Sequence, residues 1–164
     1  MPQIPFDQMP DHARLWVFAA DRDLAGAERN ALLAAVDDFQ AKWAAHGTPL
    51  TSARDLRYDR FLLVAVDEQA AGVSGCSIDA LTRQLRGLEQ EFGLALLDNG
   101  PVNYRSTEGI RRAARPAFRQ LAESGAVTAG TVVFDNTAPT VGAVREGRWE
   151  APAEETWVGR SFFS

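Results

Sequence analysis

Lysine is almost absent from this chain. Of its 17 basic residues only Lys42 is a lysine, and the others are arginines. A Walker A motif needs a lysine directly after a glycine-rich loop, whereas Lys42 follows the sequence Asp-Asp-Phe-Gln-Ala at 37–41. The sequence therefore excludes a P-loop ATPase.

Cysteine is nearly missing too, and long apolar runs are absent. The single cysteine, Cys76, cannot form an internal disulfide. No stretch approaches the roughly 20 apolar residues that span a bilayer, and no basic head with an apolar run follows Met1. We therefore expect a soluble, cytoplasmic protein with no membrane partner.

The charge pattern lacks the positive excess typical of nucleic-acid binding. The 164 residues are 46% hydrophobic and carry a formal net charge of -5, as in an ordinary globular domain. A short run of arginines could bind phosphate or an acidic partner. Nucleic-acid binding also needs aromatic residues on which bases stack, and Tyr104 is the one aromatic residue adjacent to this run. We interpret it as surface solvation and expect no nucleic-acid partner. The run comprises Arg105, Arg111, Arg112, Arg115 and Arg119, and Glu108 is the one acidic residue within it.

The first hundred residues show the pattern of a split β-α-β unit. This predicts an α+β fold with a ferredoxin-like start, a two-layer sandwich whose largely antiparallel sheet carries two main helices on one face. The expected elements are a flexible lead (1–12), strands at 13–20, 50–58, 60–67 and 94–97, and helices at 24–45 and 77–92, with a hairpin turn at 58–60.

Two apolar stripes at helical spacing predict which helix faces are buried. Ser77 is a natural N-cap for the second helix, and Gly93 stands just past its end. The stripes are Leu32, Val36, Phe39 and Trp43 in the first helix, and Ile78, Leu81, Leu85, Leu88 and Phe92 in the second.

The remaining sequence predicts a hairpin, a short helix and a last strand within one domain over 13–164. The expected ranges are 101–106 and 110–114 for the hairpin, 116–124 for the helix and 131–134 for the strand. The tail at 135–164 is loop-like but rich in aromatic residues. We expect it to pack on the domain; the alternative is an anchor for a partner or for a second copy in a homodimer.

Several segments resemble an uncharacterised family of small bacterial proteins that is common in Bacteroidetes. The most specific is the sequence Ser-Gly-Cys-Ser-Ile-Asp at 74–79. The segments 15–18, 43–47, 66–68 and 131–134 also resemble the family. Members are often labelled automatically as ABC transporter ATPases, but this sequence has no Walker A lysine to support that label. The resemblance implies a shared fold and a shared special loop, and no established activity.

The loop before the second predicted helix is the candidate site. A thiol at a helix N-terminus can have a lowered pKa and act as a nucleophile, and His46 is the histidine that could assist Cys76. The loop could instead bind an anion through its backbone, with Gly72, Ser74, Gly75, Ser77 and Asp79 as ligand residues. The simplest interpretation is that Cys76 is a small buried residue in a tight turn.

Parts of this loop are similar to two known loop motifs. A tyrosine-phosphatase loop needs an arginine after five intervening residues, but Arg83 follows Cys76 after six. The sequence at 69–74 is similar to the loop with which GNAT acetyltransferases bind acetyl-CoA, although Ser74 stands where that motif has Gly or Ala.

The first functional hypothesis is a small binding or regulatory module for a small anion or a protein partner. The alternatives are a Cys76-dependent enzyme and an acyl-CoA-binding transferase. No metal or cofactor is predicted, because two separate histidines and one cysteine do not form a metal-ligand pattern.

Overall fold

The computed structural model describes residues 3–45, 47–68 and 75–164, with the backbone alone for 75 and 76. The chain forms two compact units where the sequence predicted one domain. The first comprises 1–97 and 139–142, and the second comprises 98–138 and 143–164. Helix α4 (Val141–Arg145) spans the boundary between them.

The first unit is built on a three-stranded antiparallel sheet in the order β1-β5-β4. Strand β1 (Arg14–Ala19) and strand β4 (Thr51–Arg57) both pair with β5 (Phe61–Asp67), so they are parallel to each other with β5 between them. Helix α1 (Gly26–Lys42) connects β1 to β4 in the chain. This topology confirms the predicted split β-α-β unit and the α+β fold class.

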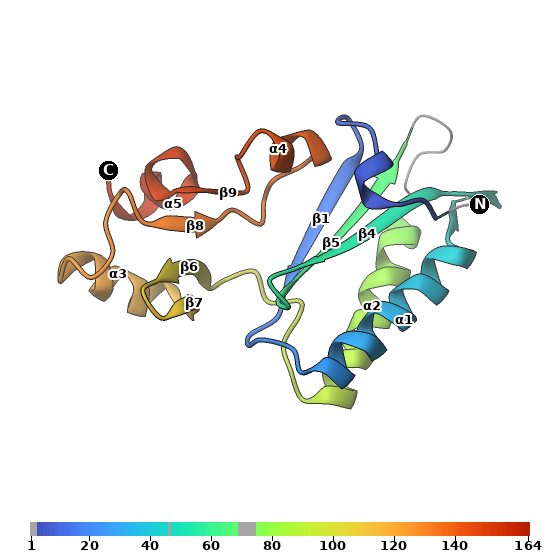
Figure 1. The fold of residues 1–164 in the computed structure, drawn as a ribbon, viewed down its shortest axis with the longest axis horizontal. Coiled ribbons are helices and arrows are strands. Elements are labelled where there is room, and N and C mark those ends of the chain that lie inside the picture. Colours follow the sequence, from blue (N-terminus) through green and yellow to red (C-terminus); the bar gives the residue numbers. More distant parts are fainter. Residues whose placement is uncertain (1–2, 46, 69–74) are drawn as a thin grey trace. The chain divides into compact units, whose positions relative to one another are not determined.

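Helices α1 and α2 (Gly75–Phe92) lie side by side on one face of this sheet (Figure 1). Strand β5 presents Leu62, Val64 and Val66 to them, all with no exposed surface. Both predicted stripes reach this core: Leu32, Val36, Trp43, Leu81, Leu85 and Leu88 are buried, and Phe39, Ile78 and Phe92 are partly buried against it. Burial of these apolar faces is the main force that fixes the helices to the sheet.

The turn between β4 and β5 is tight, as expected from the sequence. Tyr58 and Asp59 both adopt left-handed backbone conformations, with φ of 58° and 52°. Such values are uncommon outside glycine, but they match the twist that a short hairpin turn requires. Successive residues of β5 face opposite sides of the sheet, and the residues on both sides are buried. This confirms the prediction of a central strand.

The strand predicted at 94–97 is wrong. The carboxylate oxygen Oε2 of Glu89 accepts hydrogen bonds from the backbone nitrogens of Leu96 and Leu97, at 2.7 and 3.0 Å. These donors are therefore satisfied without a strand partner. Segment 139–141 pairs with the free edge of β1 instead, through hydrogen bonds with Leu15 and Ala13.

The predicted flexible lead carries structure from Gln3 onward. It contains a 3-10 turn, η1 (Phe6–Gln8), and its Ile4 nitrogen donates to the Ser52 carbonyl of β4 at 2.8 Å. Met9 is buried, with 2% of its surface exposed. A small hairpin of β2 (Ala44–Ala45) and β3 (Thr48–Pro49), which the sequence did not indicate, follows α1.

The second unit has a four-stranded antiparallel sheet in the order β7-β6-β8-β9. The strands are β6 (Val102–Ser106), β7 (Gly109–Ala113), β8 (Val132–Phe134) and β9 (Glu150–Pro152). Helices α3 (Arg115–Glu123) and α5 (Trp157–Phe162) pack through Phe118 and Val158 against Val102 and Val133. The predicted hairpin and short helix are confirmed.

The expectation of a loop-like tail after residue 134 is wrong. This part contains α4, β9, the 3-10 turn η2 (Ala153–Glu155) and α5. These elements are short, and their residues have no apolar stripe that would announce them. Pairing of β9 with β8 and packing of Val158 stabilise them instead.

Helix α1 begins without a capping side chain, because its N-cap residue is Ala25. The Glu28 carboxylate replaces the cap: Arg22 donates two hydrogen bonds of 2.7 Å to it, and the Ala25 nitrogen donates one of 2.9 Å. These bonds, that of Arg22 first, lower the pKa of Glu28 to about 2. The ionised carboxylate also suits the positive end of the helix.

Glu28→Gln should therefore destabilise the protein in a pH-dependent way. The folded-state pKa lies below the unfolded value of about 4.3, so the ionised carboxylate stabilises the fold above that value, and this stabilisation is lost as pH falls toward 2. In urea unfolding, the midpoint of the variant should lie below wild type at pH 6, and the gap should narrow by pH 3. Glu91→Gln, at an exposed position, is the control. A gap that stays constant with pH would contradict this role.

Candidate functional site

The loop selected by the sequence lies largely outside the described residues. Gly72, Ser74 and His46 are among the positions that the structure does not describe. Gly75 and Cys76 form the first two residues of α2. The pairing of Cys76 with His46, and the acetyl-CoA motif at 69–74, therefore remain predictions.

Ser77 is not the N-cap of the second helix, because α2 begins two residues earlier. Its side chain is buried, and its hydroxyl donates to the Ala44 carbonyl at 3.2 Å. Its own carbonyl accepts a hydrogen bond of 3.1 Å from the indole Nε1 of Trp43. These contacts attach the start of α2 to the residues that follow α1. Asp79, two positions further along, is exposed, so the structure does not bring these two predicted ligand residues together.

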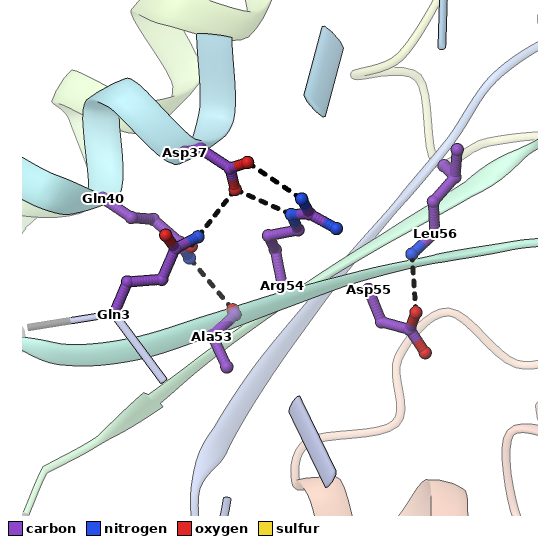
Figure 2. Close-up of polar contacts among 7 residues, drawn as sticks. All are labelled: Gln3, Asp37, Gln40, Ala53, Arg54, Asp55 and Leu56. Carbon is purple, nitrogen blue, oxygen red and sulfur yellow. Dashed lines mark hydrogen bonds and ion pairs between the residues drawn. The ribbon is translucent and has the colours of Figure 1, made fainter. Parts of the chain in front are cut away.

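A polar cluster joins the lead, α1 and β4 (Figure 2). Arg54 donates two hydrogen bonds to the Asp37 carboxylate, at 2.7 and 2.8 Å. The Gln3 amide lies between Asp37 Oδ1 and Gln40 Oε1, at 2.7 Å from each, and Gln40 donates to the Ala53 carbonyl at 2.9 Å. Gln40 has no exposed surface.

These contacts indicate a structural role for the cluster. The hydrogen bonds from Arg54, and to a smaller extent the one from Gln3, lower the pKa of Asp37. The Asp37 carboxylate is therefore half-buried and paired, whereas its neighbour Asp38 is exposed. Since each carboxylate oxygen of Asp37 accepts from Arg54, the cluster fixes the lead to the sheet rather than presenting a free acid.

A cavity of about 130 Å³ lies in the second unit. It is lined at the start of α3, at the start of α5, before β6 and after β8, segments that the sheet order brings together. The polar lining residues are Asn99, Arg115, Asn136 and Thr137, and the apolar ones are Pro101, Val102, Phe134 and Trp157. Its volume is below the roughly 300 Å³ at which pockets for drug-sized ligands begin, so it fits a small group.

Arg115 is the charged residue of the cavity. Its guanidinium lies over the Trp157 ring, 4.8 Å from the centroid, and its Nε donates to the Gly100 carbonyl at 3.0 Å. In the parts of the chain that the structure describes, no carboxylate lies within ion-pair distance of it. The stack and the hydrogen bond hold the guanidinium in place while its terminal nitrogens keep their donors.

The acids next to the cavity lining are engaged elsewhere. Asp98 accepts from the Gly100 nitrogen at 2.9 Å and pairs with Arg112 at 3.5 Å. Asp135 accepts from the Thr137 nitrogen at 3.0 Å and from the Thr137 hydroxyl. The charge of Arg115 is therefore uncompensated where it lines the cavity.

Asn136 adds a second donor. Its Oδ1 accepts a hydrogen bond of 2.9 Å from the indole Nε1 of Trp149. An indole N–H can only donate, so the amide oxygen of Asn136 faces Trp149. The amide nitrogen of Asn136 is left as a donor for a ligand in the cavity that this residue lines. The cavity thus combines a cation, an amide donor and an aromatic wall.

The structure separates the arginines of the basic run into two groups. Arg105 pairs with Glu150 at 2.9 Å, Arg111 pairs with Glu108, and Arg112 pairs with Asp98. Arg115 and Arg119 have no such carboxylate among the described residues. Sequence order cannot reveal this division, because Glu150 lies 45 positions from Arg105.

Metal binding finds no support in the described ranges, where no three histidine, cysteine, aspartate or glutamate residues gather around one point. None of the described helices is both long and apolar enough to cross a membrane. Comparison with protein-family models, with curated proteins and with solved structures gave no match.

Proposed function

We propose that this chain is a binding module that holds a small oxyanion, a carboxylate or a phosphate, in the cavity of its second unit. The observation that carries the proposal is the guanidinium of Arg115, stacked on Trp157 and without a carboxylate partner in the described part of the chain. This retains the class of function expected from the sequence, but assigns the site to residues of the second unit instead of the loop at 69–74.

The chemistry of the lining supports an anion rather than a neutral ligand. A planar guanidinium offers two parallel N–H donors to a carboxylate or phosphate, and such charge-assisted bonds are stronger than neutral ones. Pro101, Val102 and Phe134 supply the apolar wall against which a short carbon chain would rest. The small volume limits the bound part to a few heavy atoms.

Titration with acetate and with inorganic phosphate tests this proposal, because the two probes share the oxyanion and differ in charge. The indole N–H resonance of Trp157 in a proton–nitrogen correlation spectrum should move in a saturable way with at least one probe. The indole resonances of Trp16 and Trp43, in the first unit, should stay unmoved and serve as internal controls.

Arg115→Gln should abolish this saturable shift, because the shorter amide stays polar but removes the charge and the paired guanidinium donors. Arg111→Gln is the matched control, since Arg111 already pairs with Glu108 and lies outside the cavity lining. An unchanged titration in the Arg115 variant, or no saturable shift in the wild type, would overturn the proposed function.

A further inference from the structure

A second stacked arginine extends the surface beyond the cavity. The guanidinium of Arg119 lies over the Phe162 ring, 4.9 Å from the centroid. Arg115 and Arg119 are four residues apart on α3, so they lie on the same side of the helix. Their aromatic supports, Trp157 and Phe162, both belong to α5, with ring centroids 6.3 Å apart.

This pair of stacks, which we call the Arg115–Arg119 strip, carries two uncompensated charges. Neither guanidinium has a carboxylate within ion-pair distance among the described residues, unlike Arg105, Arg111 and Arg112. The ring faces restrict both side chains, so less conformational entropy would be lost on binding. The strip is thus a preorganised surface for a ligand with two negative groups.

From this arrangement we infer that the ligand is an acidic peptide segment of a protein partner, in extended conformation, with carboxylates at alternate positions. This inference rests on the proposed function for its Arg115 half. Four residues of helix rise about 6 Å, and two residues of an extended chain advance about 6.6 Å. One carboxylate would enter the cavity at Arg115, and the other would meet Arg119.

Nucleic acid fits the strip less well. Single-stranded nucleic acid binding combines a positive groove with free aromatic faces on which bases stack. Here Arg115 and Arg119 cover faces of Trp157 and Phe162. Residues 98–164 also carry 8 acidic and 8 basic groups, so the second unit has no net positive charge to attract a polyanion.

The test uses the full chain and the capped peptide Gly-Glu-Gly-Glu-Gly, with Gly-Gln-Gly-Gln-Gly as the uncharged control and oligouridylate as the nucleic-acid probe. Calorimetry or nuclear magnetic resonance measures each affinity. The glutamate peptide should bind, the glutamine peptide should not, and oligouridylate should bind more weakly than the glutamate peptide. Tighter binding of oligouridylate than of the glutamate peptide would overturn the inference.

Variants of Arg119 separate this inference from the proposed function. Arg119→Gln should weaken the glutamate peptide about tenfold, as expected for loss of one charge-assisted contact, while the acetate or phosphate shift at Trp157 persists. Arg119→Lys should lie between, because it keeps the charge and loses the flat stack. Arg111→Gln should bind the peptide like wild type.

The outcomes are distinguishable. Equal peptide affinity in wild type and Arg119→Gln, with retained anion binding at Trp157, would overturn the peptide inference alone. If the Trp157 indole resonance of the wild type showed no saturable shift with acetate or phosphate, the proposed function would be overturned as well. Unchanged thermal unfolding of the Arg119 variants would show that any lost affinity comes from the surface rather than from misfolding.

Discussion

Replacing Phe118 with alanine should lower the free energy of unfolding by about 3 to 5 kcal/mol. Phe118 has no exposed surface, and its ring lies 5.5 Å from Tyr104, 5.0 Å from Phe162 and 6.3 Å from Phe163 between ring centroids. These neighbours come from a strand and from the C-terminal end of the chain. Alanine would leave a cavity at the junction of several elements, where collapse in one direction breaks packing in another.

Urea unfolding followed by circular dichroism measures this loss. Gln120→Ala, on the exposed side of the same helix, is the matched control and should change the free energy of unfolding by no more than about 0.5 kcal/mol. A loss below about 1 kcal/mol for the Phe118 variant would show that its ring is not the centre of the second core.

Leu85→Ala should cost about 2 to 5 kcal/mol. Leu85 lies in the middle of α2, has no exposed surface, and belongs to the core that joins α1, α2 and β5. The helix keeps its propensity when leucine becomes alanine, so the loss would come from the removed apolar contacts and the cavity left behind. It is a large part of the 5 to 15 kcal/mol that stabilises a typical domain.

The matched control for Leu85 is its neighbour Gln84, which is exposed. Gln84→Ala should leave the urea midpoint close to that of the wild type, because the side chain contributes little to packing. If both variants lost the same small amount, the stripe would not be the buried face of α2.

Local sequence predicted the elements whose signal repeats over many residues. The stripe from Leu81 to Leu88 recurs over two turns, so one noisy position does not obscure it. The apolar run of β5 and the turn at Tyr58 were also predictable, because residues adjacent in the sequence determine them. Short elements such as β9 have too few residues for a period, and their pairing partners decide whether they form.

The errors have specific physical causes. Apolar residues at 94–97 resemble a strand, but the distant end of the Glu89 side chain satisfies their backbone donors. Ser77 has the chemistry of an N-cap, yet the Ala44 carbonyl offers its hydroxyl a partner inside the protein. In both cases a hydrogen-bonding group, the backbone N–H at 96–97 or the hydroxyl of Ser77, had two possible partners, and the sequence favoured the wrong one.

The candidate site was missed for a related reason. Along the chain, Tyr104 is the one aromatic residue adjacent to the basic run, and this pattern favours surface solvation. The stacking rings instead come from Trp157 and Phe162, about 40 positions after Arg115 and Arg119. The presence of both groups was visible in the sequence, but their contact was not.

By itself, the sequence determined the α+β class, the split β-α-β order, the two buried helix faces and the absence of a Walker A lysine, because local periodicity and residue identity suffice for each. Only the tertiary structure decided which arginines are paired, which aromatic rings support the others, and why position 159 needs glycine. A Cβ at Gly159 would lie 2.6 Å from the Ala153 carbonyl oxygen. Such close approaches depend on how α5 packs against η2, which is a property of the folded chain rather than of any short segment.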